Sequence, residues 1–393
     1  MWDDQWAVMN YYTEGDLTFN NLWRILIEFY HGQYAPLNQY LYLLLYTFFG
    51  YNPFFYHLVS MLIHLTNACL VYYMLKKLFM LSGRIDVDRV NILSFLTALI
   101  FTIHTINTEA VCWMSASKVP LYALFYFGAT ITFLLYIERK KKVYYLVTLL
   151  LFTLSFLAKD QAVTFPLWAL LIYWFLNRKI VDKKIWLEMM PFFLLSVLFG
   201  IITLMSQSVT GRGLLSNEQT YPFFQRIIIG IYTFIEYFTK SLIPFKLSYL
   251  YPFPVVMGDS LPNWMLFYPS LLIIAVFGLW RYLKQWMITF GLIFFVIHIF
   301  IVLNIVQLSR FSIFADRYNY IAMIGIGLVI SYFVVLSFDK LKGYKKNLLS
   351  IFFVFYLLYL GIYSNLRVRD WYDTDTIKKE MRDLLKQRDD YNQ

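Results

Sequence analysis

The first residues of this chain that could do chemistry are two adjacent carboxylates, Asp3 and Asp4, in the opening stretch Met-Trp-Asp-Asp-Gln-Trp. The chain that follows them is mostly apolar. Carboxylates beside a bilayer are costly to desolvate and are usually retained for chemistry or for ion handling. The pair therefore favours an enzyme over a scaffold.

A third acid, Glu109, follows His104 after the four residues Thr-Ile-Asn-Thr, in a tight loop between two apolar runs. A carboxylate here could share protons with His104, bind a cation or orient an acceptor hydroxyl. Alternatively, Glu109 could cap the short helix that carries Val111 and Trp113, because acidic groups favour helix N-termini. The sequence leaves these alternatives open.

Cations near the ends of apolar runs form the next set of candidates, and Arg310 and Arg317 flank a short apolar stretch that ends at Asp316. Arginine offers a fixed fork of donors that suits phosphate oxygens, so a lipid phosphate or pyrophosphate could be held there. Lys118 and Lys159 belong to the same set. The alternative is that Arg317 pairs with Asp316 or extends toward the interface.

The composition indicates the class of protein that must position these groups. The chain has 393 residues, of which 60% are hydrophobic and 15% charged, and its mean hydropathy is +0.57. Soluble domains carry about 25% charged residues. The net charge of +10 lies in short basic clusters between apolar runs, as the positive-inside rule expects, so a nucleic-acid partner is not predicted. Cys69 and Cys112 show neither metal-ligand spacing nor a disulfide framework.

The apolar runs have the length that crosses about 30 Å of hydrocarbon. They predict an all-α, polytopic helical membrane protein of about 10–11 membrane helices, with residues 1–54 as an external loop with interfacial helices, 55–365 as the bundle and 366–393 as a soluble amphipathic tail. The predicted interfacial helix covers 36–50, and the tail has apolar residues at helical spacing. The predicted spans are 55–79, 90–104, 117–136, 143–158, 162–178, 186–206, 265–282, 286–306, 319–338 and 346–365.

Basic clusters between the spans should face the cytoplasm, which places the carboxylates and the cations above on the opposite side. The segment 222–243 is apolar enough to cross, but one crossing would put the later basic clusters on the wrong side. We therefore expect it to enter and leave on the same side or to lie along the interface. Irregular backbone at that depth is tolerated only inside protein or against water.

Three polar residues on a predicted span, His57, His64 and Asn67, have a spacing that suggests interhelical hydrogen bonds rather than metal ligation. His298 lies alone in another span and is expected to be a packing residue. The chain has no Gly-rich phosphate loop, no Cys/His metal motif and no Gly-x-Ser-x-Gly elbow, so a nucleotide-driven pump or a soluble-type hydrolase is not supported. The sequence predicts no certain cofactor, although a divalent metal ion is compatible with the carboxylates.

Several short motifs, in this order and spacing, resemble the membrane part of the transmembrane O-mannosyltransferases with tetratricopeptide repeats and of their bacterial relatives. The motifs are Trp-Asp-Asp-Gln at 2–5, Gly-Gln-Tyr-Ala-Pro-Leu-Asn at 32–38, Phe-Gly-Tyr-Asn-Pro-Phe at 49–54, His57 with His64 and Asn67, His104, Thr-Glu-Ala-Val-x-Trp at 108–113, Ala-Lys-Asp at 158–160 and Ala-Asp-Arg-Tyr at 315–318. Relatives often have Ser-Glu-Arg-Lys-Asp where this chain has Ser-Ala-Ser-Lys-Val at 115–119, and Lys-Glu where it has Lys159-Asp160.

The resemblance implies the family C glycosyltransferase fold, a polyprenyl-phosphate-linked sugar as donor and a protein or glycan as acceptor. It also implies a site on the extracytoplasmic face of the membrane, which is the periplasmic face if the protein lies in a bacterial inner membrane. It also implies a hydrophobic span before the acidic motif and repeats after the tail. The implied catalytic residues are Asp3 or Asp4 and Glu109, and the donor-phosphate ligands are Arg310, Arg317, Lys118 and Lys159. The supporting residues are His104, Asp160, Asp316, Tyr318, His64 and Asn67. The alternative to this glycosyltransferase is a non-enzymatic transporter of lipid-linked glycans or a membrane scaffold.

Overall fold

The computed structural model describes residues 4–209, 221–255, 258–305, 312–371, 375, 377–379 and 382. Within these ranges all regular secondary structure is helical, apart from one isolated β-bridge between Tyr30 and Gln33. The predicted all-α class is therefore confirmed for the described part of the chain. Asp3 and Arg310 lie outside the described residues, as do Met381 and Leu384 of the tail.

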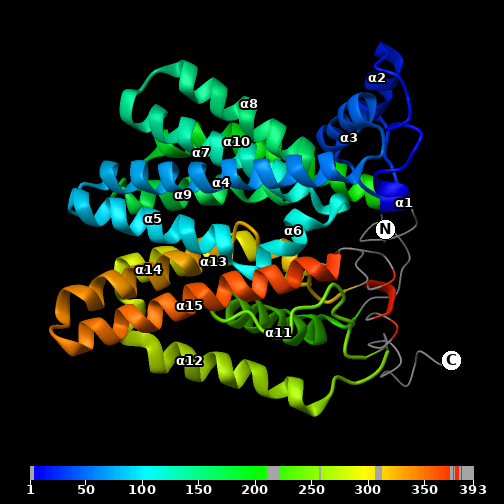
Figure 1. Cartoon of the computed structure of the whole chain (residues 1–393). Coiled ribbons are helices and arrows are strands. Elements are labelled where there is room, and N and C mark those ends of the chain that lie inside the picture. The colour runs from blue at the N-terminus through cyan, green and yellow to red at the C-terminus, as the bar shows by residue number, and fades with distance from the viewer. Residues whose placement is uncertain are drawn as a thin grey trace.

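The helices form a bundle whose long members run roughly side by side, with three N-terminal helices at one end (Figure 1). The N-terminal helices are α1 Asp4–Ala7, α2 Phe19–Ile27 and α3 Pro36–Phe49. The remaining α-helices are α4 Pro53–Ser82, α5 Val87–Ile103, α6 Thr108–Cys112, α7 Lys118–Arg139, α8 Lys142–Ala158, α9 Phe165–Phe175, α10 Lys183–Ser208, α11 Phe223–Leu242, α12 Tyr268–Leu283, α13 Trp286–Ile299, α14 Met323–Lys340 and α15 Tyr344–Val368.

In the described part of the chain, six helical segments are long and apolar enough to cross a membrane, or seven if α5 and the helical segment Thr105–Cys112, bent by 52° relative to it, count as one broken span. This fits an integral, multi-pass membrane protein. Each of the ten predicted spans coincides with a helix, but the spans predicted at 90–104, 143–158, 162–178 and 286–306 correspond to helices of 17, 17, 11 and 14 residues. The count by length and composition is thus lower than the predicted 10–11.

Packing in the bundle is close enough to require glycine. Helices α13 and α14 approach each other at Gly291 and Gly325, where a Cβ added to Gly291 would lie 2.7 Å from the Gly325 carbonyl oxygen. Small residues let helix backbones approach closely in membranes, where dispersion contacts contribute strongly to association. By contrast, α12 buries no residue against the rest of the chain.

The two ends of the bundle differ in charge. The turns between α4 and α5, α7 and α8, and α14 and α15 lie at one end, and these turns carry basic clusters (Figure 1). Helices α1, α2, α3 and α6 lie at the opposite end. The positive-inside rule predicts that the basic end faces the cytoplasm, and this orientation stays a prediction.

Helix α11 corresponds to the segment that is expected to enter and leave on one side. Its last residue, Leu242, accepts a hydrogen bond from Tyr356 of α15, and the chain that follows meets α15 closer to the C-terminal end of that helix. Tyr359 donates to the Pro244 carbonyl, and Tyr363 accepts from the Leu247 N–H. The chain therefore turns back after α11 and returns along α15 to the end of the bundle that carries α1, as expected.

The N-terminal helices are defined by caps that the sequence encodes. Thr18 accepts a hydrogen bond from the Asn21 N–H at the start of α2, and Asn52 accepts one from Phe54 at the start of α4. Gly50, between α3 and α4, has φ = +59°, a conformation that favours glycine. Helix α3 covers nearly the whole predicted interfacial helix. These caps fix the sharp turn that brings α1 to α3 over the end of the bundle.

Candidate functional site

Asp4 is the first residue of α1 and is only 4% exposed. Its carboxylate accepts a hydrogen bond from the Ser115 backbone N–H at 3.0 Å and a second from the Ser115 hydroxyl. These two donors belong to a segment 111 residues further along the chain. The acidic motif is therefore anchored to the bundle rather than left in a free loop, as a group that reacts with precision requires.

The turn that carries Ser115 is itself held in place by side chains of α3. The Tyr42 hydroxyl donates to the Met114 carbonyl at 2.8 Å and accepts from the Ser117 hydroxyl at 2.9 Å. Ser117 also contacts the Asn38 side-chain oxygen at 3.2 Å. Each of these side chains is buried. Because buried hydrogen bonds are costly to break, they keep the Ser115 donors in one position relative to Asp4.

A small cavity of about 60 Å³ lies between α1, α2, α3 and the turn after α6, and Asp4 itself does not line it. Trp6 and Ala7 of α1 form part of its wall, and so does Ser115. Lys118, a predicted phosphate ligand, also lines this cavity, where its ammonium group donates to the Gln33 side-chain oxygen. Lys118 therefore lies on the Asp4 side of the site.

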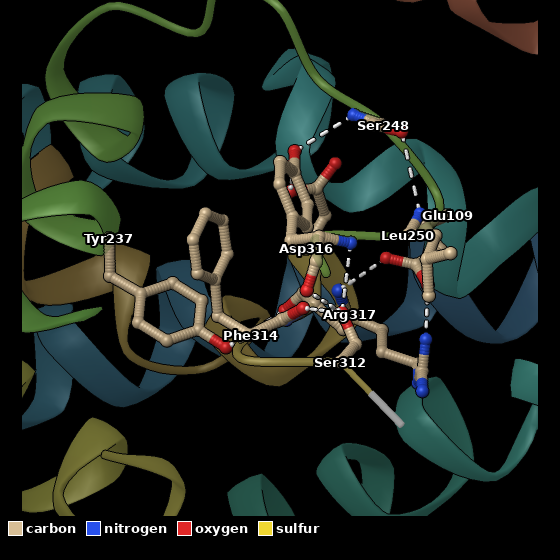
Figure 2. A network of polar contacts seen from close by, with 10 residues as sticks. Glu109, Tyr237, Ser248, Leu250, Ser312, Phe314, Asp316 and Arg317 are labelled. Atoms are coloured by element: carbon tan, nitrogen blue, oxygen red, sulfur yellow. Dashed lines mark hydrogen bonds and ion pairs between the residues drawn. The ribbon is translucent and has the colours of Figure 1, made fainter. Parts of the chain in front are cut away.

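Glu109 lies in the first turn of α6, is 1% exposed, and forms an ion pair with Arg317 (Figure 2). The Arg317 backbone N–H also donates to this carboxylate at 2.9 Å. The proposed pairing of Arg317 with Asp316 is wrong, since Arg317 pairs with Glu109 instead. Consecutive residues of a helical turn point in different directions, which explains why the neighbours in sequence do not pair.

His104 does not bond to Glu109 in this structure, although the sequence spacing allows it. Its Nε2 lies 3.2 Å from the Ser241 carbonyl oxygen, and its Nδ1 accepts from the Ile106 N–H at 3.2 Å. These bonds connect the loop after α5 to the end of α11. His104 thus has a positioning role, and the proton-sharing alternative for Glu109 has no geometric basis here.

Asp316, next to Arg317 in sequence, is 2% exposed and accepts a hydrogen bond from the Tyr251 hydroxyl at 2.9 Å (Figure 2). Burial and the nearby Glu109 carboxylate raise the pKa of Asp316 to about 7, and Arg367 and Lys240 act in the opposite direction. This end of the bundle therefore holds two buried acids whose negative charges oppose each other.

Two of the predicted cations, Lys159 and Arg317, meet at the ring of Tyr318. The Lys159 ammonium lies 5.2 Å from the ring centroid, and the Arg317 guanidinium carbon lies 4.9 Å from it. Lys159 is also 3.9 Å from the Asp160 carboxylate. Cation–π contacts thus hold both cations over one aromatic face, in addition to their ion pairs with Asp160 and Glu109. The sequence places these residues on separate motifs, and the structure brings them together.

The segment 108–117 connects the two parts of the site. Arg317 lies over the Trp113 ring, with its guanidinium carbon 5.0 Å from the centroid, and Ser115, two residues later, binds Asp4. Trp113 in turn stacks on Trp371, with 5.5 Å between centroids. Ser115 and Trp371 were not among the predicted site residues. Ser115 lies where the chain departs from the related motif, so the sequence carries no signal for its role.

The remaining predicted residues, His64 and Asn67, lie deeper in the bundle and bond to Tyr320. His64 Nδ1 is 2.7 Å from the Tyr320 hydroxyl, which also accepts from Asn67 at 3.2 Å. His64 Nε2 also lies 3.1 Å from the Thr102 carbonyl oxygen of α5, and Asn67 donates to the Pro120 carbonyl of α7 at 2.8 Å, so the predicted interhelical hydrogen bonds are confirmed for these two residues. His298, which bonds to Tyr126 and to the Phe294 carbonyl, is confirmed as a packing residue.

Among the described residues, no group of three or more His, Cys, Asp or Glu side chains could hold a metal ion. Comparison with protein-family models, with curated proteins and with solved structures gives no match for this chain. The resemblance to the O-mannosyltransferases therefore stays a prediction from motifs, and the geometry above has to be interpreted on its own chemistry.

Proposed function

We propose that this chain is an integral-membrane glycosyltransferase that moves a sugar from a polyprenyl phosphate to a hydroxyl group of a protein or glycan acceptor. The observation that carries the proposal is the geometry of Asp4. Its carboxylate is held by two donors of Ser115, and Ser115 lines a cavity at the end of the bundle opposite the basic turns. A carboxylate held in one position by a residue of a cavity wall is a candidate general base.

In the proposed reaction the acceptor hydroxyl attacks the anomeric carbon of the donor sugar. The proton of that hydroxyl passes to the Asp4 carboxylate, a new C–O glycosidic bond forms, and the bond between the sugar and the phosphate oxygen breaks. The polyprenyl phosphate leaves with the electron pair of that bond. Arg317 and Lys159 would stabilise the negative charge that develops on this leaving group.

Glu109 has a different role in this scheme. Because its carboxylate is already bound by the Arg317 guanidinium and backbone N–H, it orients that cation rather than accepting the acceptor's proton. A buried arginine without a partner carboxylate would be strongly destabilised. Glu109 is therefore a positioning residue, and the candidate base narrows to the acidic motif at the start of the chain.

The proposal is tested by replacing Asp4 with Asn in the full chain and assaying sugar transfer in membranes from a polyprenyl-phosphate hexose. Loss of a general base lowers the rate by about 10²-fold or more, so Asp4→Asn should be nearly inactive. Asp16→Asn, an exposed acid of the same region, is the matched control and should keep wild-type activity.

Full activity of Asp4→Asn would overturn the assigned base. Movement of the intact lipid-linked sugar across the membrane, without bond cleavage, would favour the transporter instead. The candidate acids and cations named above lie toward the end of the bundle that carries α1 rather than at its middle, and this favours sugar transfer over transport.

A further inference from the structure

We infer that the cavity beside Asp4 is a subsite for one neutral pyranose ring, which it holds by aromatic faces and by side-chain amides. The inference rests on the proposed function and names the substrate group at this part of the site. The cavity is built almost entirely from residues 6–42, to which the turn after α6 contributes Ser115 and Lys118.

Aromatic side chains form much of the cavity wall. Trp6, Tyr12, Tyr30 and Tyr42 all line it, together with the small apolar residues Ala7, Ala35 and Pro36. The aromatic side chains are fixed by their neighbours. Tyr12 packs edge-on against Tyr30 with 5.4 Å between ring centroids, and the ring centroids of Trp6 and His31 are 5.0 Å apart. Rigid aromatic faces with a polar edge suit ligands that have an apolar face and hydroxyl groups, as a sugar ring does.

Neutral amide groups supply the polar part of the wall. Gln33, Asn38 and Gln39 line the cavity, and each side-chain amide can both donate and accept hydrogen bonds. Part of this capacity is already used, since Gln33 accepts from Lys118, Asn38 accepts from Ser117 and Gln39 donates to Thr13. A hydroxyl group has the same double capacity. Several amides around one small space therefore match a polyhydroxylated ligand better than a phosphate, which only accepts from these groups at neutral pH.

The two charged residues of the wall already have partners. Glu28 forms an ion pair with Arg24 at 2.9 Å and accepts from the Tyr12 hydroxyl at 2.5 Å. Lys118 donates to Gln33. The wall thus contributes one acid and one base, Glu28 and Lys118, whose formal charges sum to zero. This favours a neutral sugar and places the phosphate elsewhere, near Arg317 and Lys159.

The volume of about 60 Å³ sets the part of the ligand that enters. A water molecule needs about 15 Å³ on this measure, so the cavity holds roughly four waters, or the hydroxyl edge of one ring. Gln33 at the rim is exposed, so the rest of the ring can remain outside. Ser115, which binds Asp4, and Trp6, two residues after Asp4, both line the cavity, so a ring held here is separated from the proposed base by one layer of side chains.

The test uses the purified full chain in detergent and saturation-transfer NMR with methyl α-hexopyranosides as probes. Transfer of saturation to the ring protons is expected for the wild type. Removal of an aromatic contact should weaken the affinity about fivefold or more, so Trp6→Ala and Tyr30→Leu should both weaken binding. Trp23→Ala, a half-exposed tryptophan of α2 that does not line the cavity, should bind as the wild type does.

The absence of saturation transfer to every pyranoside, or an equal loss in Trp23→Ala, would overturn the subsite. Asp4→Asn separates this inference from the proposed function, since it should abolish transfer of sugar while it keeps pyranoside binding. Pyranoside binding in a wild type that transfers no sugar supports the subsite and contradicts the enzyme. Displacement of the probe by a polyprenyl-phosphate hexose assigns the ring to the donor, and simultaneous binding assigns it to the acceptor.

Discussion

Asp4 and Glu109 lie at the same end of the bundle and are buried to nearly the same degree. The segment 108–117 contains Glu109 and binds Asp4, yet the surroundings of the two carboxylates differ in kind. Asp4 receives its hydrogen bonds from a serine, whose N–H and O–H are neutral. Glu109 receives its bonds from Arg317, including a direct ion pair. A carboxylate that already has a fixed cation has its charge compensated, whereas one held by neutral donors keeps its negative charge for a substrate.

The two regions also differ in access. On the Asp4 side there is a cavity whose wall includes Ser115, the residue that holds the Asp4 carboxylate. Around Glu109 the neighbours are packed side chains, with Trp113 and Tyr318 on the faces of the arginine partner. Burial of an acid thus does not identify a base by itself. The charge of its partner and the space beside it decide whether it serves chemistry or architecture.

The largest effect that separates the two regions is expected for stability. Glu109→Gln leaves Arg317 without its countercharge, and removal of one partner of a buried pair costs about 3–5 kcal/mol. Arg317 retains 20% exposure of its side chain, so the lower end of that range is expected. The thermal midpoint in detergent should fall by many degrees, whereas Asp4→Asn, which keeps a group that can accept from Ser115, should change it little.

A double variant sharpens this comparison. Replacing both partners by apolar groups removes the uncompensated charge, so Glu109→Leu with Arg317→Met should recover much of the stability lost in the single variant. Equal thermal midpoints for the two single variants, Glu109→Gln and Asp4→Asn, would mean that the two carboxylates have the same structural role.

How far the sequence leads differs between the fold and the site. Hydrophobic length predicted a helix at every proposed span, because each span has to bury its backbone polar groups internally. The return of the chain after α11 was predicted from the positions of the basic clusters. One membrane crossing by this segment would have placed Lys340 on the side opposite to the earlier basic clusters. Pairings could not be predicted in this way. Arg317 stands next to Asp316 in sequence but binds Glu109, because the geometry of a short helical turn decides direction.

A second limit concerns neutral residues. Ser115 holds Asp4 although serine carries no charge pattern, and it lies where the chain differs from the related motif. Trp371 contacts Trp113 from the far end of α15, a proximity that only the packed bundle reveals. Sequence patterns identify residues that are chemically unusual, whereas the donors and aromatic faces that position them are common residue types.

An intermediate effect is expected at Ser115. Ser115→Ala removes the hydroxyl donor to Asp4 but keeps the backbone N–H, so one of two hydrogen bonds is lost. A hydrogen bond to a charged group contributes about 1.5–3 kcal/mol, but the remaining donor keeps the carboxylate in place. We expect about a tenfold lower kcat for sugar transfer with an unchanged KM. An unchanged kcat would show that the backbone donor alone positions Asp4.

The last expected effect, which is confined to a limited pH range, concerns the pH dependence of stability on the Glu109 side. Burial and the charge of Glu109 raise the pKa of Asp316 to about 7, above its ordinary value of 3.8. The folded state then binds this proton more tightly than the unfolded state, so stability falls as the pH rises from about 4 to about 7 and changes little above that.

In Asp316→Asn this slope should be absent, since an amide keeps the bond from Tyr251 without a charge. Thermal midpoints measured between pH 4.5 and 8 test this, and an equal slope in both proteins would assign the dependence to another group. The value of about 7 already includes the opposing charges of Arg367 and Lys240, and the slope would show that the Glu109 side tolerates only one free negative charge.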